Sequence, residues 1–248
     1  MLYYWIVNGG SLREGRRRAG WTQGRLAARL GVTQAYLSLM ECGRRRVPER
    51  VARAAARLLG LPATAVPMSD AADVRARVTD RWVAQALARL GYPGLAYLGK
   101  SGAKKHPAEL LLRALALDEL EPRLVEALPW VLLRFDGFDT EAMTVWAKTW
   151  DLQNRLGFTV SLARQVAEHS PSYRGRLDKL RRFEEQLERS RLAREDTYGR
   201  REPSERMRDW LRANRTREAR HWKLLTDLKL EHLPYAHQNP GAVAELSA

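Results

Sequence analysis

The chain has 248 residues, a formal net charge of +14 at pH 7 and 45% hydrophobic residues. This length accommodates a small domain and a second one of about 150 residues, and the positive charge favours nucleic acid as a partner. The single cysteine, Cys42, excludes an intrachain disulfide and a multi-cysteine zinc site, and no apolar run approaches the ~20 residues of a membrane-spanning helix.

The first ten residues are apolar but short, and they lack the basic start of a signal peptide. We therefore expect residues 1–10 to form an N-terminal arm, with a short strand or plain upstream residues as the alternatives, and we expect the protein to be cytoplasmic. A first domain is expected over residues 11–67. It begins with a helix over residues 12–19, for which Ser11 is the cap.

Residues 20–46 have the layout of a helix, a tight turn and a second helix. Thr22 is a good N-cap for a helix that runs to Leu30. Gly31 ends that helix, because glycine adopts the left-handed conformation at low cost. Thr33 caps a second helix that runs to Glu41. This pattern predicts a helix-turn-helix DNA-binding motif.

The second helix of this motif has an outer face near its N-terminus. Leu37 and Met40 point inward at i, i+3 spacing. The residues left on the outer face are Gln34, Ala35, Ser38 and Leu39. A glutamine can make two hydrogen bonds to adenine, and a small apolar side chain can contact a thymine methyl group. We therefore predict that this face contacts bases in the major groove.

Positive charge is concentrated around the motif. Residues 1–67 contain twelve arginines and three glutamates, a net charge of +9, so only +5 remains for the other 181 residues. Arg44, Arg45 and Arg46 directly follow the second helix, where a DNA backbone would pass. Such clustering is typical of a polyanion-binding surface.

At these residues the chain resembles the lambda-repressor-like (Xre) helix-turn-helix family. The matching residues, which lie between positions 12 and about 61, are Arg16, Thr22, Gln23, Leu26, Ala27, Leu30, Gly31, Val32, Gln34, Leu37, Ser38, Glu41 and Gly43. The resemblance implies a five-helix domain that binds double-stranded DNA. It differs from the family pattern at Ala35 and Leu39, positions that are often polar, so fewer hydrogen bonds to bases are expected.

The resemblance also implies roles for individual residues. The outer-face residues named above would contact bases, and Arg16 would form a buried structural ion pair with Glu41. The expected phosphate contacts are Gln23, Thr33, Tyr36, Arg44, Arg45 and Arg46.

Pro48 suits the first position of a fourth helix that runs to about Leu59, and residues 62–66 form a last short turn. Residues 67–70 are the expected domain boundary. Apolar residues at helical spacing then predict an all-α second domain over residues 70–233. Its expected helices cover residues 70–90, 108–117, 122–133, 140–155, 158–169, 173–198 and 204–228. Pro129 should kink or split the third of these, and Gly157 should break or bend the chain. Residues 234–248 are expected to be a disordered tail.

The sequence contains no recognisable catalytic constellation. The five histidines are scattered, and no metal-binding, phosphate-binding or dinucleotide motif is present, so we expect no catalytic residue, metal or cofactor. Asp136 and Asp139 fit a turn with a helix cap. Trp146 and Trp150 share a helix face, and two interpretations are open: they line an effector pocket, or they fill a helical core or a dimer seam.

The sequence therefore predicts a dimeric, all-α transcriptional regulator, a repressor that controls its own gene through a palindromic operator. A homodimer is expected because one recognition helix reads only a few base pairs. The alternative is an antitoxin or defence-system regulator whose C-terminal domain binds a partner protein, either a toxin or a defence component. An enzyme tethered to DNA is the third hypothesis, and no residues support it.

Overall fold

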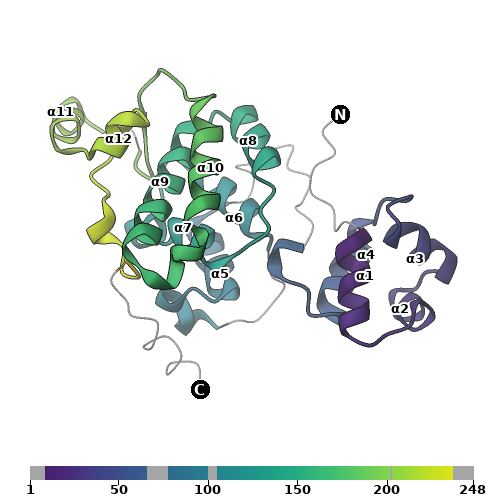
Figure 1. Cartoon of the computed structure of the whole chain (residues 1–248). Helices are drawn as coiled ribbons and strands as arrows, with labels where there is room; N and C mark the ends of the chain where they lie inside the picture. The colour runs from purple at the N-terminus through teal and green to yellow at the C-terminus, as the bar shows by residue number, and fades with distance from the viewer. Residues whose placement is uncertain (1–8, 66–77, 100–104, 202, 237–248) are drawn as a thin grey trace. The chain divides into compact units, whose positions relative to one another are not determined.

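The computed structural model describes residues 9–65, 78–99, 105–201 and 203–236. The chain divides into two compact units, the first made of Met1–Ala71 with Ser101–Glu109, and the second of Ala72–Lys100 with Leu110–Ala248. Helices dominate both units (Figure 1), so the predicted all-α fold class is confirmed.

The first unit contains four α-helices and one 3-10 turn within residues 9–65. They are α1 (Gly9–Arg18), α2 (Gln23–Leu30), α3 (Gln34–Glu41), α4 (Glu49–Leu58) and η1 (Ala63–Ala65). In this described range, the fifth helix that the resemblance implies is only the turn η1. Pro48 is the N-cap of α4 and not its first residue.

Helix α1 begins earlier than predicted. Gly9 and Gly10 are helical, so Ser11 lies inside the helix and is not its cap. Gly9 packs against the backbone at the end of α3, where an added Cβ would collide with the carbonyl oxygen of Met40. A glycine is thus required where these helices meet. Residues 1–8 of the predicted arm lie outside the described residues.

From residue 78 onward, one long helix and the shorter elements around it make up most of the structure. The helices are α5 (Asp80–Leu90), η2 (Pro93–Leu98), α6 (Pro107–Leu115), α7 (Pro122–Arg134), α8 (Thr140–Thr149), α9 (Gln153–His169), η3 (Pro171–Arg176), α10 (Leu177–Glu188), α11 (Glu205–Asn214), α12 (Arg217–His221) and η4 (Leu230–His232). Two short strands, β1 (Asp196–Thr197) and β2 (Leu224–Leu225), pair in parallel. Helix α9 is buried over most of its 17 residues and contacts α7, α8, α10 and α12 (Figure 1).

Two predicted interruptions are absent. Helix α7 continues through Pro129, so of the predicted kink or split, the split is wrong. Gly157 lies inside α9, so the predicted break there is wrong too. The ring of Trp222 packs where a Cβ of Gly157 would be. The glycine therefore permits close packing and does not end the helix.

Other helices are shorter than predicted. The expected helix over residues 140–155 ends at Thr149, and Asp151 adopts a positive φ of 57° before α9 begins. The long helix expected over residues 173–198 is the 3-10 turn η3 followed by α10, which ends at Glu188. The helix expected over residues 204–228 is divided into α11, α12 and β2.

The ends of the second unit also differ from expectation. Helix α5 begins at Asp80 with Thr79 as its N-cap, and residues 70–77 of the predicted helix lie outside the described residues. Pro234 to Ala236 were predicted to belong to a disordered tail, but Tyr235 is buried and its hydroxyl donates to the carbonyl of Glu126 (2.8 Å). Residues 237–248 are not described.

Candidate nucleic-acid interface

Short-range contacts fix the geometry of the turn between α2 and α3. The hydroxyl groups of Thr22 and Thr33 accept hydrogen bonds from the amides of Arg25 and Tyr36, so both predicted N-caps are confirmed. Gly31 adopts the left-handed conformation (φ 65°, ψ 39°), as predicted. The amide of Val32 donates to the carbonyl of Ala27 (3.0 Å), which closes the turn. The angle between the helices is thus set by capping groups present in the local sequence.

A single apolar cluster holds these helices from behind. Its buried side chains are Leu12, Leu26, Ala27, Leu30, Leu37, Met40, Val47, Val51, Ala52 and Ala55. They come from α1, α2, α3, α4 and the segment before α4. The buried side chains that α3 contributes are Leu37 and Met40, and Tyr36 packs partly against the cluster, so the opposite face of α3 is left toward solvent.

The expected ion pair between Arg16 and Glu41 is present. The Arg16 Nε and Nη2 atoms donate to the two carboxylate oxygens of Glu41 at 2.6 and 2.9 Å, and Arg16 Nη1 donates to the carbonyl of Trp21. The Glu41 side chain is 1% exposed. Burial alone would raise the pKa of Glu41, but the hydrogen bonds from Arg16 and Gln23, with the charge of Arg16, hold it below its usual value.

Gln23 has a structural partner that the sequence did not indicate. Its amide nitrogen donates to Glu41 Oε2 at 3.0 Å, so Gln23 links the start of α2 to the end of α3. An amide nitrogen carries two N–H groups, and this bond uses one of them. The phosphate contact assigned to Gln23 stays a prediction, and it would have to use the remaining group.

The four residues expected to contact bases lie together on the free side of α3. Gln34 and Ala35 are exposed, Ser38 is half-buried and Leu39 is 37% exposed. Gln34 lies beside Gly24, where an added Cβ would be 3.7 Å from its Oε1. Tyr36 is half-buried on the same helix. The accessible part of this face therefore combines one amide, one hydroxyl and two apolar side chains, which is a surface that suits base edges.

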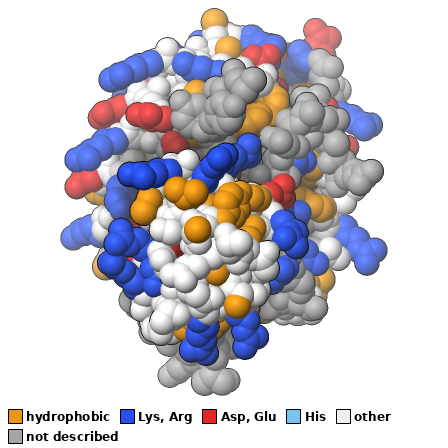
Figure 2. All heavy atoms as spheres, turned by 90° about the vertical axis from the view of Figure 1, so that its right-hand side faces the viewer, with side chains coloured by type: hydrophobic (Ala, Val, Ile, Leu, Met, Phe, Trp, Pro, Cys, Tyr) orange, Lys and Arg blue, Asp and Glu red, His pale blue; other side chains and the backbone are white. Residues whose placement is uncertain are grey.

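Most arginines within residues 9–65 have no acidic partner among the described residues. Its three glutamates within residues 9–65 each pair with one arginine, in the pairs Arg16–Glu41, Arg18–Glu14 and Arg53–Glu49. The arginines of this range that form no ion pair are Arg13, Arg17, Arg25, Arg29, Arg44, Arg45, Arg46, Arg50 and Arg57. Figure 2 shows one face of the molecule with basic side chains around a largely uncharged area. Such a surface attracts a polyanion.

The basic loop after α3 is held by the end of that helix. The amide of Arg45 donates to the carbonyl of Leu39 (3.1 Å), and Gly43 adopts a φ of 72°. Cys42, the residue that follows α3, is exposed. Arg25 stacks over the ring of Trp21 at 4.7 Å, so its guanidinium is oriented without an acid.

The fold and this surface define a DNA-binding domain, and residues 9–67 match a family described as a helix-turn-helix domain. This stretch is therefore a helix-turn-helix domain of the Xre, or lambda-repressor-like, class, and the resemblance found in the sequence is confirmed. No curated protein and no solved structure matches the chain. None of the helices in the described ranges is both long and apolar enough to cross a membrane.

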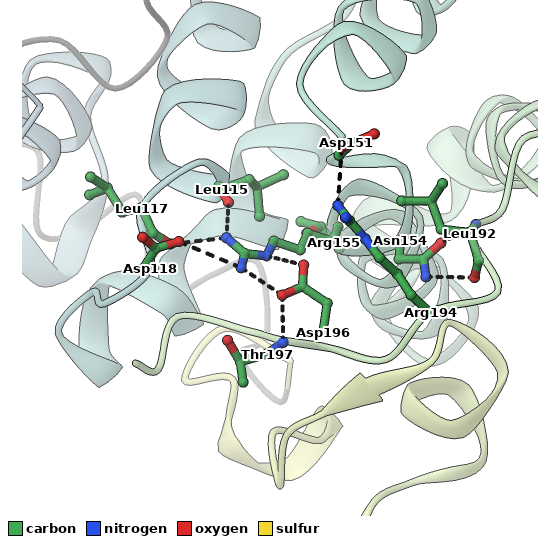
Figure 3. Close-up of polar contacts among 11 residues, drawn as sticks. Leu115, Leu117, Asp118, Asp151, Asn154, Arg155, Leu192, Arg194, Asp196 and Thr197 are labelled. Carbon is green, nitrogen blue, oxygen red and sulfur yellow. Dashed lines mark hydrogen bonds and ion pairs between the residues drawn. The ribbon is translucent and has the colours of Figure 1, made fainter. Parts of the chain in front are cut away.

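In the second unit, the most connected polar side chain is that of Arg155 on α9 (Figure 3). Its Nε and Nη2 donate to Asp196 at 2.7 and 2.8 Å, and Nη1 donates to the carbonyls of Leu115 and Leu117. The Arg155 side chain is 6% exposed. All its nitrogens are engaged within the protein, so Arg155 joins the end of α6, helix α9 and strand β1.

The two tryptophans considered for an effector pocket do not form an apolar one. The rings of Trp146 and Trp150 lie 4.6 Å apart, centroid to centroid, and both residues are half-buried. Trp150 borders a hollow of about 330 Å³ whose other lining side chains are mostly charged, including Asp118, Arg194 and Glu195. This arrangement does not distinguish an effector pocket from a helical core or a dimer seam.

Proposed function

We propose that the protein is a sequence-specific transcriptional regulator that acts in the cytoplasm and binds double-stranded DNA. In this proposal α3 enters the major groove, and Gln34, Ala35, Ser38 and Leu39 contact bases. The backbone contacts come from Gln23, Thr33, Tyr36 and Arg44 to Arg46. The observation that carries the proposal is the exposed face of α3 bordered by arginines without acidic partners.

The same proposal includes a dimer that represses its own gene from a palindromic operator. One helix of eight residues presents four candidate base-contacting side chains, and this reads too few base pairs to define a site among many competing sequences. Two copies on half-sites about one helical turn apart would supply the missing specificity.

The test is a titration of the full chain, at two salt concentrations, against DNA from upstream of its own gene and against random DNA of equal length. We expect tighter binding to the upstream fragment, with two protomers per site. Equal and salt-sensitive binding to both fragments would contradict sequence reading. One protomer per site at saturation would contradict the dimer.

Two substitutions separate base contacts from phosphate contacts. Gln34→Ala should weaken binding to the cognate site by ~1–3 kcal/mol and leave random DNA almost unaffected. Arg44→Ala should weaken both fragments alike and reduce the salt dependence by about one ion. Arg217→Ala is the control, because it removes an exposed arginine of the second unit that forms no ion pair with described residues. Equal losses on both fragments for Gln34→Ala would show that α3 does not read the sequence.

A further inference from the structure

A small cavity lies between the end of α7 and the start of α10. Its volume is about 280 Å³. Its lining residues are Leu132, Phe135, Asp136, Gly137, Phe138, Thr140, Arg176, Lys179, Leu180, Arg182 and Phe183. Ligand pockets in proteins usually measure about 300–1,000 Å³, and this cavity lies just below that range, so it suits only a small molecule.

The inner part of the cavity is apolar. Leu132, Leu180 and Phe183 are buried and form its floor, whereas Phe135 and Phe138 are half-buried and form its wall. The ring of Phe135 is held edge-on by Trp130 at 6.0 Å. Phe135 also lies beneath the guanidinium of Arg134, 5.6 Å from its ring centre. The wall is thus fixed by neighbours outside the cavity.

The outer part of the cavity carries an excess of positive charge. Lys179 donates to Asp136 Oδ1 at 2.8 Å, and Arg176 also pairs with Asp136. Arg182 is exposed and forms no ion pair with any described residue. Three cations therefore border the opening against one carboxylate, a local net charge of +2.

These cations recur every third residue along η3 and α10. Arg176, Lys179 and Arg182 lie on one side of the buried Leu180 and Phe183. Like charges at this spacing repel one another and destabilise the helix that carries them. Asp136 offsets this repulsion at Arg176 and Lys179, and an anion beside Arg182 would offset the rest.

We propose that this cavity binds a small amphipathic carboxylate. The apolar body of the ligand would occupy the space between Phe135, Phe138 and Phe183. Its carboxylate would lie at the opening and accept hydrogen bonds from Arg182, whose planar guanidinium matches a carboxylate in shape. The binding stands apart from the DNA function, and only a role of this ligand as an effector rests on the proposed function.

The experiment is calorimetric titration of the full chain with octanoate and with 3-phenylpropanoate, which share a carboxylate and differ in the apolar body. The uncharged comparison is 1-octanol, which has as many carbon atoms as octanoate but no carboxylate. We expect at least one carboxylate to bind with one molecule per chain, and 1-octanol to bind at least ten-fold more weakly. The measurement uses no DNA, so its failure is distinguishable from failure of the proposed DNA function.

Two variants locate the binding. Arg182→Ala should weaken carboxylate binding about ten-fold, which corresponds to about 1.4 kcal/mol, because it removes charged hydrogen bonds to the ligand. Arg189→Ala removes an exposed arginine at the end of the same helix, outside the cavity lining, and should bind as the unsubstituted chain does. No saturable binding of either carboxylate would overturn the proposal. Equal binding of 1-octanol, or equal effects of the two variants, would overturn it too.

Discussion

The arginines of the two units have different surroundings. In the helix-turn-helix unit, nine of the twelve arginines in residues 9–65 form no ion pair within the described part of the chain. In the second unit, Arg155, Arg164 and Arg215 each join segments that are distant in sequence through carboxylate partners. The same residue type thus leaves charge free for a polyanion in one unit and stabilises the fold in the other. The comparison shows why net charge predicts a partner only when the acids have been located.

Removal of Arg155 should have the largest effect on this comparison. Arg155→Ala should lower the free energy of unfolding by about 4 kcal/mol, because breaking a buried ion pair leaves its partner uncompensated. Urea denaturation followed by tryptophan fluorescence would measure the change. The matched control is Arg194→Ala, whose pair with Asp151 is exposed on both sides (60% and 59%) and should cost below about 0.5 kcal/mol. Similar losses in the two variants would contradict the structural role of Arg155.

Acid should destabilise the protein through protonation of His106. This residue belongs to the first unit, although it lies beyond the predicted domain boundary at residue 67. Its Nδ1 accepts from the amide of Ala108 and its Nε2 donates to the carbonyl of Thr64, so the ring is neutral. Burial lowers the pKa of His106 from 6.5 to about 4.

Because the folded pKa lies below the unfolded one, the contribution of neutral His106 is complete above pH 6.5 and is lost as the pH falls toward 4. This amounts to about 3 kcal/mol. His106→Asn, which cannot titrate, should flatten this part of the stability curve between pH 7 and 4. An unchanged slope in the variant would show that the dependence comes from other groups.

A single methyl group should disturb the second unit where the sequence suggested a helix break. Gly157→Ala should destabilise the chain by about 2 kcal/mol, because the new Cβ collides with the ring of Trp222. Gly175→Ala is the control, since nothing lies within 4 Å of its added Cβ. In the double variant with Trp222→Phe, the two costs should not add, because the smaller ring leaves space. Full additivity in thermal unfolding would contradict this contact.

These positions show what the sequence could and could not predict. Thr22, Gly31 and Thr33 act within one helical turn, so their positions alone sufficed to place α2, α3 and the exposed face of α3. Gly157 depends on Trp222, which is 65 residues away in the sequence, so no local pattern could reveal its role. Helix α7 continues through Pro129 because the helix is packed into the unit, and packing overrides the low helix propensity of proline.

The candidate interface, like the fold, was predicted only in part. The outer face of α3 follows from helical spacing, and the ion pair of Arg16 with Glu41 was implied by the family resemblance. The hydrogen bond from Gln23 to Glu41 was missed, because two positions 18 residues apart carry no signal of contact. The cavity beside α10 was missed for the same reason, since Phe135 and Phe138 come from the segment after α7, whereas Phe183 and the cations come from η3 and α10, about 40 residues later.

Loss of the Thr33 helix cap should have the smallest effect on stability, and it tests whether this cap also contributes to DNA binding. Thr33→Ala removes the N-cap of α3 and should cost about 1 kcal/mol, as should the control Thr216→Ala, which removes the cap of α12 in the second unit. Only Thr33→Ala should also weaken DNA binding, because the first turn of α3 positions Gln34 and Ala35.

Two further substitutions separate capping from phosphate contact at this residue. Asparagine and aspartate both cap helices well, so Thr33→Asn and Thr33→Asp should keep the stability of the unsubstituted chain. The negative charge introduced by Thr33→Asp would repel the DNA backbone and reduce the affinity for all DNA sequences. Thr33→Asn introduces no charge and would retain the affinity. If the aspartate variant binds DNA as tightly as the asparagine variant in a filter-binding assay, Thr33 does not lie against a phosphate. Thr33 would then contribute to the interface only as the N-cap of α3. The sequence pattern that identified Thr33 would indicate how the domain folds and not how it recognises DNA.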